Sequence, residues 1–135
     1  VQDKSKYAVM DIGGDDAGAV ALGRFAPTIK EEDNYDMVFV VNFYRPLSRT
    51  AEEAFDIMRE IEATSKLKFT SIVNNSNLGE LTTPEAVLLT VKEAEKLSAL
   101  CNLPIKMTSV TEKIYNHLND RIKNLFCLSL QNKIF

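Results

Sequence analysis

The chain has 135 residues, of which 45% are hydrophobic and 26% are charged, and its formal net charge is −3. These values are ordinary for one compact globular domain and argue against a disordered or membrane-embedded chain. No apolar run approaches the roughly 20 residues that a membrane helix needs. Because nucleic-acid-binding proteins normally carry a basic face, the acidic balance predicts no direct nucleic-acid partner.

The two cysteines, Cys101 and Cys127, lack the spacing of a metal site. We interpret them as buried thiols in a reducing compartment, which predicts a cytoplasmic protein. The first residues show no apolar signal region, in agreement with this prediction. The single histidine, His117, leaves no room for a histidine-based metal site.

Short apolar runs alternate with helical segments along the chain. This pattern predicts an α/β fold, a three-layer sandwich with a mainly parallel sheet. The first run, 7–10, is predicted to be a strand that ends at Asp11, and a helix is expected over 17–26. The second run, 37–41, is continuously apolar, which is typical of a strand covered on both faces.

Thr50 is predicted to begin the next helix. Thr50 and Glu53 have the spacing of a capping box, in which the hydroxyl and the carboxylate each satisfy a free backbone N–H. One face of this helix would lie on the sheet. That face carries Ala51, Ala54, Phe55, Met58 and Ile61.

The second half of the chain repeats the pattern. The run 69–73 predicts a strand, and Pro84, which follows two threonines, opens a helix expected to reach Leu100. A strand is expected over 105–110 and a helix over 112–125, whereas 126–135 receives no assignment.

Asp11 and the glycines after it form the sharpest candidate site, because ligands of open α/β sheets bind beyond the carboxyl ends of the strands. An aspartate there can hold Mg²⁺ beside a nucleotide, and Gly13 and Gly14 let the backbone approach the terminal phosphate. Asp15 and Asp16 would add two carboxylates to an oxygen-ligand metal site. The alternative is a capped helix start or a tight turn with solvated charges.

Asn74 and Asn75 follow the third predicted strand. An asparagine side chain both donates and accepts hydrogen bonds, so it can bind the edge of a purine. The alternative is a turn pair that stabilises its own backbone. The phosphate-binding pattern Gly-x-x-x-x-Gly-Lys-[Ser/Thr] is absent, because Gly13 and Gly18 have its glycine spacing but are followed by alanine and valine.

Three strings of residues, 11–25, 44–47 and 72–79, are similar to uncharacterised bacterial ATP-binding proteins of the MinD/ParA/CobQ group. The resemblance covers nearly the whole chain and matches the part of those proteins that follows the P-loop. It implies that Asp11 is the Walker B aspartate near Mg²⁺ and that Gly14 is the switch glycine near the γ-phosphate. It also implies that Asn74 or Asn75 contacts the adenine of ATP.

The resemblance implies an ATPase switch that dimerises with ATP, of which residues 1–135 form one domain, the C-terminal half. The lysine and the Ser/Thr that hold the phosphates and Mg²⁺ have no counterpart in this chain, so we expect weak ATP binding and no activity by the chain alone. The strand edges left open predict a homodimer, other self-association, or a further N-terminal segment. The alternatives are a non-catalytic interaction domain and a Mg²⁺-dependent phosphohydrolase that uses Asp11, Asp15 and Asp16.

Overall fold

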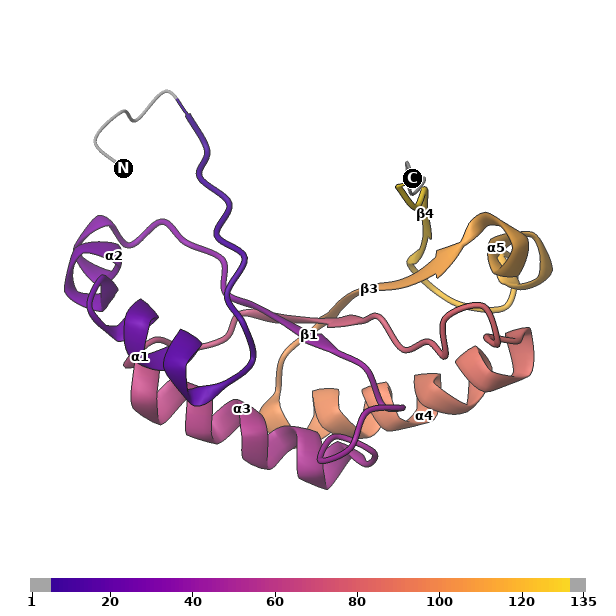
Figure 1. Ribbon diagram of the computed structural model, residues 1–135, viewed down its shortest axis with the longest axis horizontal. Helices are drawn as coiled ribbons and strands as arrows, with labels where there is room; N and C mark the ends of the chain where they lie inside the picture. The colour runs from indigo at the N-terminus through magenta and orange to yellow at the C-terminus, as the bar shows by residue number, and fades with distance from the viewer. Residues whose placement is uncertain (1–5, 132–135) are drawn as a thin grey trace, which may run out of the picture.

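A computed structural model describes residues 6–131 of the chain. The described part contains a four-stranded sheet in the order β1-β2-β3-β4, in which every neighbouring pair is parallel. The α/β class with a parallel sheet is therefore confirmed, and the arrangement is consistent with a three-layer fold (Figure 1). In chain order the elements are α1 (Asp16–Gly23), α2 (Ala26–Glu32), β1 (Val38–Val41), α3 (Ala51–Ser65), β2 (Ser71–Asn74), α4 (Pro84–Cys101), β3 (Ile105–Thr111), α5 (Glu112–Leu118) and β4 (Leu125–Leu128).

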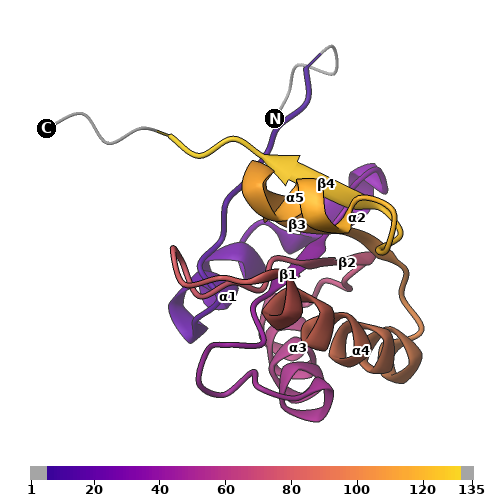
Figure 2. The same ribbon diagram turned by 90° about the vertical axis from the view of Figure 1, so that its right-hand side faces the viewer.

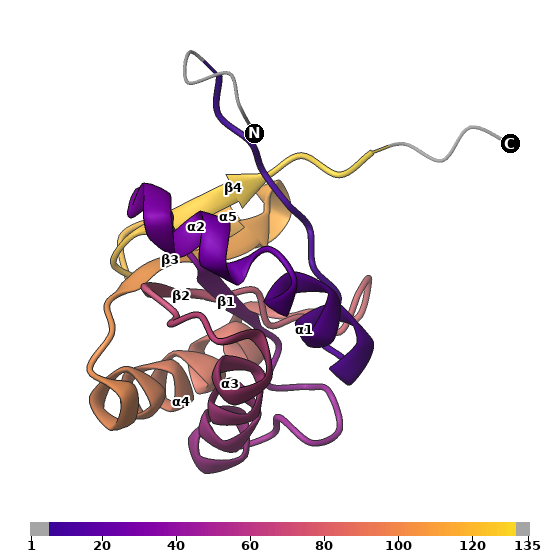
Figure 3. The same ribbon diagram turned by 90° about the vertical axis from the view of Figure 1, so that its left-hand side faces the viewer.

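Helices α3 and α4 lie side by side on one face of the sheet, below the strands in Figures 2 and 3. The core fills the space between them and the strands. Phe39 and Ile72 contribute from the sheet, and Met58 and Leu97 contribute from the helices. Helices α1 and α2 lie at the β1 end of the molecule and α5 lies at the other end (Figure 1). The middle of the opposite sheet face has less cover, and Val40 on it is 60% exposed.

The predicted helix starts are confirmed. The Thr50 hydroxyl oxygen accepts a hydrogen bond from the Glu53 N–H at 3.2 Å and begins α3. Thr83 caps α4 in the same way, with Pro84 as the first helical residue. Along the described chain, the return bond expected from the Glu53 carboxylate is not found. A glutamate of α4, Glu93, accepts the Ala51 N–H at 2.8 Å instead.

The strand expected over 7–10 is wrong. These residues precede α1 as an extended segment outside the sheet, with Tyr7 100% and Val9 94% exposed. An apolar run becomes a strand only when a neighbouring strand satisfies its backbone groups, and no strand pairs with this segment in the described structure. The helix expected over 17–26 divides into α1 and α2, which are separated by Arg24 and Phe25.

The helix expected over 112–125 is also wrong in its second half. Helix α5 ends at Leu118, and a turn leads to Asn124, whose φ of 57° is left-handed. Asparagine adopts this conformation more readily than most residues, so it can reverse the chain here. The following residues, Leu125–Leu128, form β4 and pair with β3, which supplies the tertiary partner that the local pattern could not reveal.

The two cysteines differ from the prediction that both are buried. Cys101 is half-buried and Cys127 is exposed on β4, and both are free thiols. Burial is the main cause that raises the pKa of the Cys101 thiol above its usual value. Over residues 6–131, none of the helices has the length and apolar character needed to cross a lipid bilayer.

Candidate functional site

Asn74 lies at the carboxyl end of β2 and is 0% exposed. Its side-chain Nδ2 donates to the Thr90 hydroxyl at 3.0 Å, and its Oδ1 accepts from the Ser76 hydroxyl at 2.6 Å. Ser76 in turn accepts the Phe43 N–H at 2.9 Å. Since these bonds join β2 to α4 and to the loop after β1, Asn74 has a structural role and is closed to a ligand.

Asn75 is half-buried and remains open to a ligand. Its backbone N–H donates to the Val41 carbonyl at 2.9 Å, which fixes the residue beside the end of β1. Its Oδ1 accepts from the Ser109 hydroxyl of β3 at 2.7 Å. Within residues 6–131, no hydrogen bond uses its Nδ2 atom. The Ser109 contact therefore orients the amide while leaving a donor group free.

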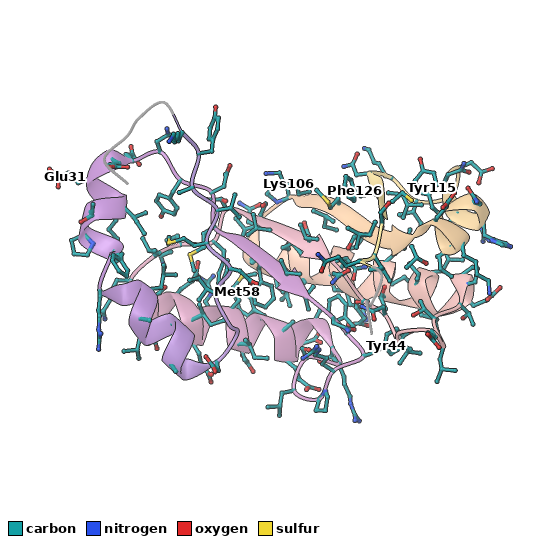
Figure 4. All side chains as sticks on the ribbon, turned by 45° about the horizontal axis from the view of Figure 1, so that its top comes forward. Glu31, Tyr44, Met58, Lys106, Tyr115 and Phe126 are labelled. Carbon is teal, nitrogen blue, oxygen red and sulfur yellow. The ribbon has the colours of Figure 1, made fainter. Side chains whose placement is uncertain are left out.

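Asn42 was not predicted as a site residue, although it is the first polar residue after β1. Its Oδ1 accepts from the N–H groups of Tyr44 at 2.9 Å and Asn77 at 3.3 Å, and its Nδ2 donates to the Asn77 carbonyl at 3.3 Å. These bonds tie the loop after β1 to the loop after β2. The Tyr44 hydroxyl donates to the Ala86 carbonyl at 2.6 Å and anchors the same loop on α4. Figure 4 shows Tyr44 near the end of β1.

Asp11, Gly13 and Gly14 lie in the exposed segment that leads into α1. The structure places this segment on the α1 side of the molecule, whereas Asn75 follows β2 (Figure 1). Asp11, Gly13 and Gly14 are near one another because they are close in the sequence. No described hydrogen bond links them to Asn74 or Asn75. Asp15 caps α1, with its Oδ1 accepting the Gly18 N–H at 2.8 Å, as the capped-helix alternative expects.

The glycines near α1 have different structural needs. A Cβ at Gly18 would collide with the Gly13 carbonyl oxygen, so the turn into α1 requires glycine there. A Cβ at Gly14 would meet no atom within 4 Å, and one at Gly13 would make only an ordinary contact with Asp15. The packing of the chain therefore explains Gly18 and leaves the space around Gly14 open.

Two surface cavities lie away from Asn75. One, of about 390 Å³, runs between the start of α1 and α3 and is lined by Gly14, Asp15, Leu47, Ile57 and Glu60, among others. The second, of about 300 Å³, lies between α4 and the loop before β4 and is lined in part by Arg121 and Lys123. The described side chains include no group of three or more histidine, cysteine or acidic residues arranged to hold a metal ion.

Comparisons with protein-family models, with curated proteins and with solved structures give no match.

Proposed function

We propose that this chain is part of a nucleotide-binding switch ATPase of the MinD/ParA type, with ATP and Mg²⁺ as its ligands. The observation that carries the proposal is the position and the free side-chain donor of Asn75. This asparagine is fixed by Ser109 at the carboxyl end of a parallel strand, with its Nδ2 donor free among the described residues. That edge is where α/β sheets bind nucleotides. Of the two asparagines, Asn75 is therefore the one assigned to adenine.

The residues assigned to the phosphate side fit such a ligand in part. Asp11 is exposed, and a carboxylate of this kind is an oxygen ligand for Mg²⁺ or for its water. Open space beside Gly14 allows a phosphate oxygen to approach the backbone. Bound Mg-ATP would supply the γ-phosphate, and Asp11 would position the metal and its water near that group.

The chain has no lysine in a phosphate-binding loop, and that loop supplies most phosphate contacts in such sites. We therefore expect ATP to bind weakly to the chain alone, and we assign hydrolysis to the whole protein, acting as a homodimer in the cytoplasm. These assignments follow from the resemblance and are part of the proposal.

Equilibrium dialysis of the intact chain with labelled Mg-ATP tests this proposal. We expect a dissociation constant of about 1 mM or weaker. Asn75→Ala should weaken binding about fivefold, since one neutral hydrogen bond contributes about 1 kcal/mol. Asn34→Ala is the matched control, because Asn34 is an exposed asparagine before β1. Micromolar binding by the chain, or equal effects of the two variants with folding intact, would contradict the proposal.

The second candidate function is a non-catalytic interaction domain. The observation that favours it is the exposed apolar surface of the sheet, which includes Val40 on β1 and Phe126 on β4. Figure 4 shows Phe126 and Lys106 on one side of the strands and Met58 on the other, towards α3. This candidate predicts no ATP binding that depends on Asn75. The phosphohydrolase alternative comes last, because Asp15 is engaged as a helix cap.

A further inference from the structure

The outer edge of β1 is open in the described structure. Val41 and Met37 accept backbone hydrogen bonds from Asn75 at 2.9 Å and Thr70 at 2.8 Å, so these residues direct their backbone groups towards β2. Alternate residues of a strand direct their backbone groups to opposite sides. The N–H and C=O groups of Val38 and Val40 therefore point outwards, and no other strand formed by residues 6–131 lies on that side of β1.

This edge lacks the charged residues, the proline and the bulge that commonly prevent pairing with another chain. Residues 38–41 are Val-Phe-Val-Val, without a lysine, a proline or any other charged or polar residue, and no bulge interrupts their pairing with β2. Such an edge is a template for one additional strand.

The same chain carries a strand-forming segment with no sheet to join. Residues 7–10 are Tyr-Ala-Val-Met, and the segment is extended and exposed. It has the composition of a buried strand, but water surrounds its apolar side chains. Gly13 and Gly14 connect it to α1, and the open space at Gly14 gives this connection room to turn.

We propose that two copies of the chain associate by reciprocal strand addition, in which residues 7–10 of each copy pair with the outer edge of β1 of the other. Each copy supplies the unpaired segment 7–10 and the outer edge of β1, so a twofold arrangement pairs each of them twice. Symmetric pairing of this kind is the commonest form of homodimer, and exchange of an element between copies is a low-cost route to it. This inference specifies the surface for the self-association in the proposed function and needs no nucleotide.

Two variants each disrupt one side of the proposed contact, in which residues 7–10 of one copy pair with β1 of the other; this contact is called the joint. Val9→Lys places a charge on the donated strand. Val40→Pro removes an outward N–H of β1 without removing a bond to β2. The matched controls are Leu89→Lys, on the exposed surface of α4, and Cys127→Pro. The second control removes an outward N–H of β4, because Asn124, three residues earlier, directs its carbonyl to Thr108 of β3.

Sedimentation equilibrium of the intact chain without nucleotide measures the association. We expect a reversible dimer whose dissociation constant rises at least about tenfold in Val9→Lys and in Val40→Pro and changes less than about twofold in the controls. An equimolar mixture of Val9→Lys and Val40→Pro should associate more strongly than either variant alone, because the mixed dimer retains one intact joint.

A monomer at every concentration would overturn the proposal. Equal weakening by a control variant would also overturn it, as would a mixture no stronger than its components. Circular dichroism checks that Val40→Pro folds. If Val40→Pro does not fold, Val9→Lys still tests the proposal, because this variant alters only an exposed side chain. Since no ATP is present, failure here is distinct from failure of the nucleotide proposal.

Discussion

Glu93 links α4 to the first turn of α3, and its removal is predicted to destabilise the fold. Its Oε2 accepts the Ala51 N–H at 2.8 Å, and its Oε1 accepts from Lys96 Nζ at 3.1 Å. Ala51 is fully buried in the folded chain, where the Glu93 carboxylate is the hydrogen-bond partner of its N–H. The free N–H groups at the start of a helix also favour a negative charge nearby.

The loss in Glu93→Ala combines two effects. A hydrogen bond to a charged group contributes about 1.5–3 kcal/mol, which includes the cost of leaving its buried partner unsatisfied. The salt bridge to Lys96 adds little, because the lysine side chain is largely exposed. We therefore expect Glu93→Ala to lower the free energy of unfolding by about 2 kcal/mol. Glu93→Gln keeps an acceptor without the charge and should lose about half as much.

Urea denaturation at several pH values tests this expectation. The hydrogen bond from Ala51, and to a lesser extent Lys96, hold the pKa of Glu93 below its usual value against the opposing effect of burial. A carboxyl group with a lowered folded-state pKa stabilises the fold fully above its unfolded pKa, and the effect is lost as the pH falls through the folded value. The advantage of the wild type over Glu93→Gln should therefore be complete at neutral pH and decline in acid.

Glu95→Ala is the matched control, because Glu95 is exposed on the same helix and should change stability by less than about 0.5 kcal/mol. A loss of stability in Glu93→Ala no larger than in this control would contradict the role assigned to the bond between Glu93 and Ala51. A pH-independent difference between wild type and Glu93→Gln would contradict it as well.

Two further predictions concern positions where the backbone favours or requires glycine, and they use the same denaturation assay. Gly18→Ala should destabilise the fold by about 1–3 kcal/mol through its clash with the Gly13 carbonyl, whereas Gly14→Ala should be within about 0.5 kcal/mol of wild type. Similar losses in both variants would show that Gly14 is also needed for packing. Leu47 has a φ of 71° after Pro46 in a turn closed by the Ser48 N–H to the Arg45 carbonyl, and it is 76% exposed. Leu47→Gly should stabilise by about 0.5–1 kcal/mol, because glycine has no steric penalty there, and a loss of stability would show that the Leu47 side chain makes a needed contact.

The features that the sequence predicted correctly depend on short-range chemistry. Thr50 and Pro84 carry their own helix-start signals within four residues, and the structure confirms both starts. The apolar run before Asn42 identified β1, but the expectation that both faces of this strand are covered is wrong, because Val40 is 60% exposed. The class of the fold follows from the alternation of such segments.

The features that were missed depend on partners far along the chain. The Glu93 carboxylate reaches Ala51 across 42 positions, so no local pattern reveals it. Leu125–Leu128 is apolar but was not predicted to be a strand, and it becomes β4 by pairing with β3. The segment 7–10 shows the reverse case. Its composition suits a strand, but the described fold gives it no neighbouring strand to pair with.

The candidate site follows the same division. The sequence predicted that Asn74 and Asn75 follow an apolar strand, and the structure has this strand, β2, ending at Asn74. Only the tertiary structure separates their roles, because Thr90 of α4 engages Asn74 and Ser109 of β3 engages Asn75. Hydroxyl groups on neighbouring elements thus determine which asparagine is open to a ligand.

An NMR titration of the ¹⁵N-labelled chain with Mg-ATP tests whether Asn75 and the glycines before α1 bind the same nucleotide. We predict that signals of the Asn75 side-chain NH₂ and of the Gly13 and Gly14 backbone amides shift together as the nucleotide reaches millimolar concentrations. Shifts confined to the cavity beside Arg121 and Lys123, or none at saturating nucleotide, would contradict it.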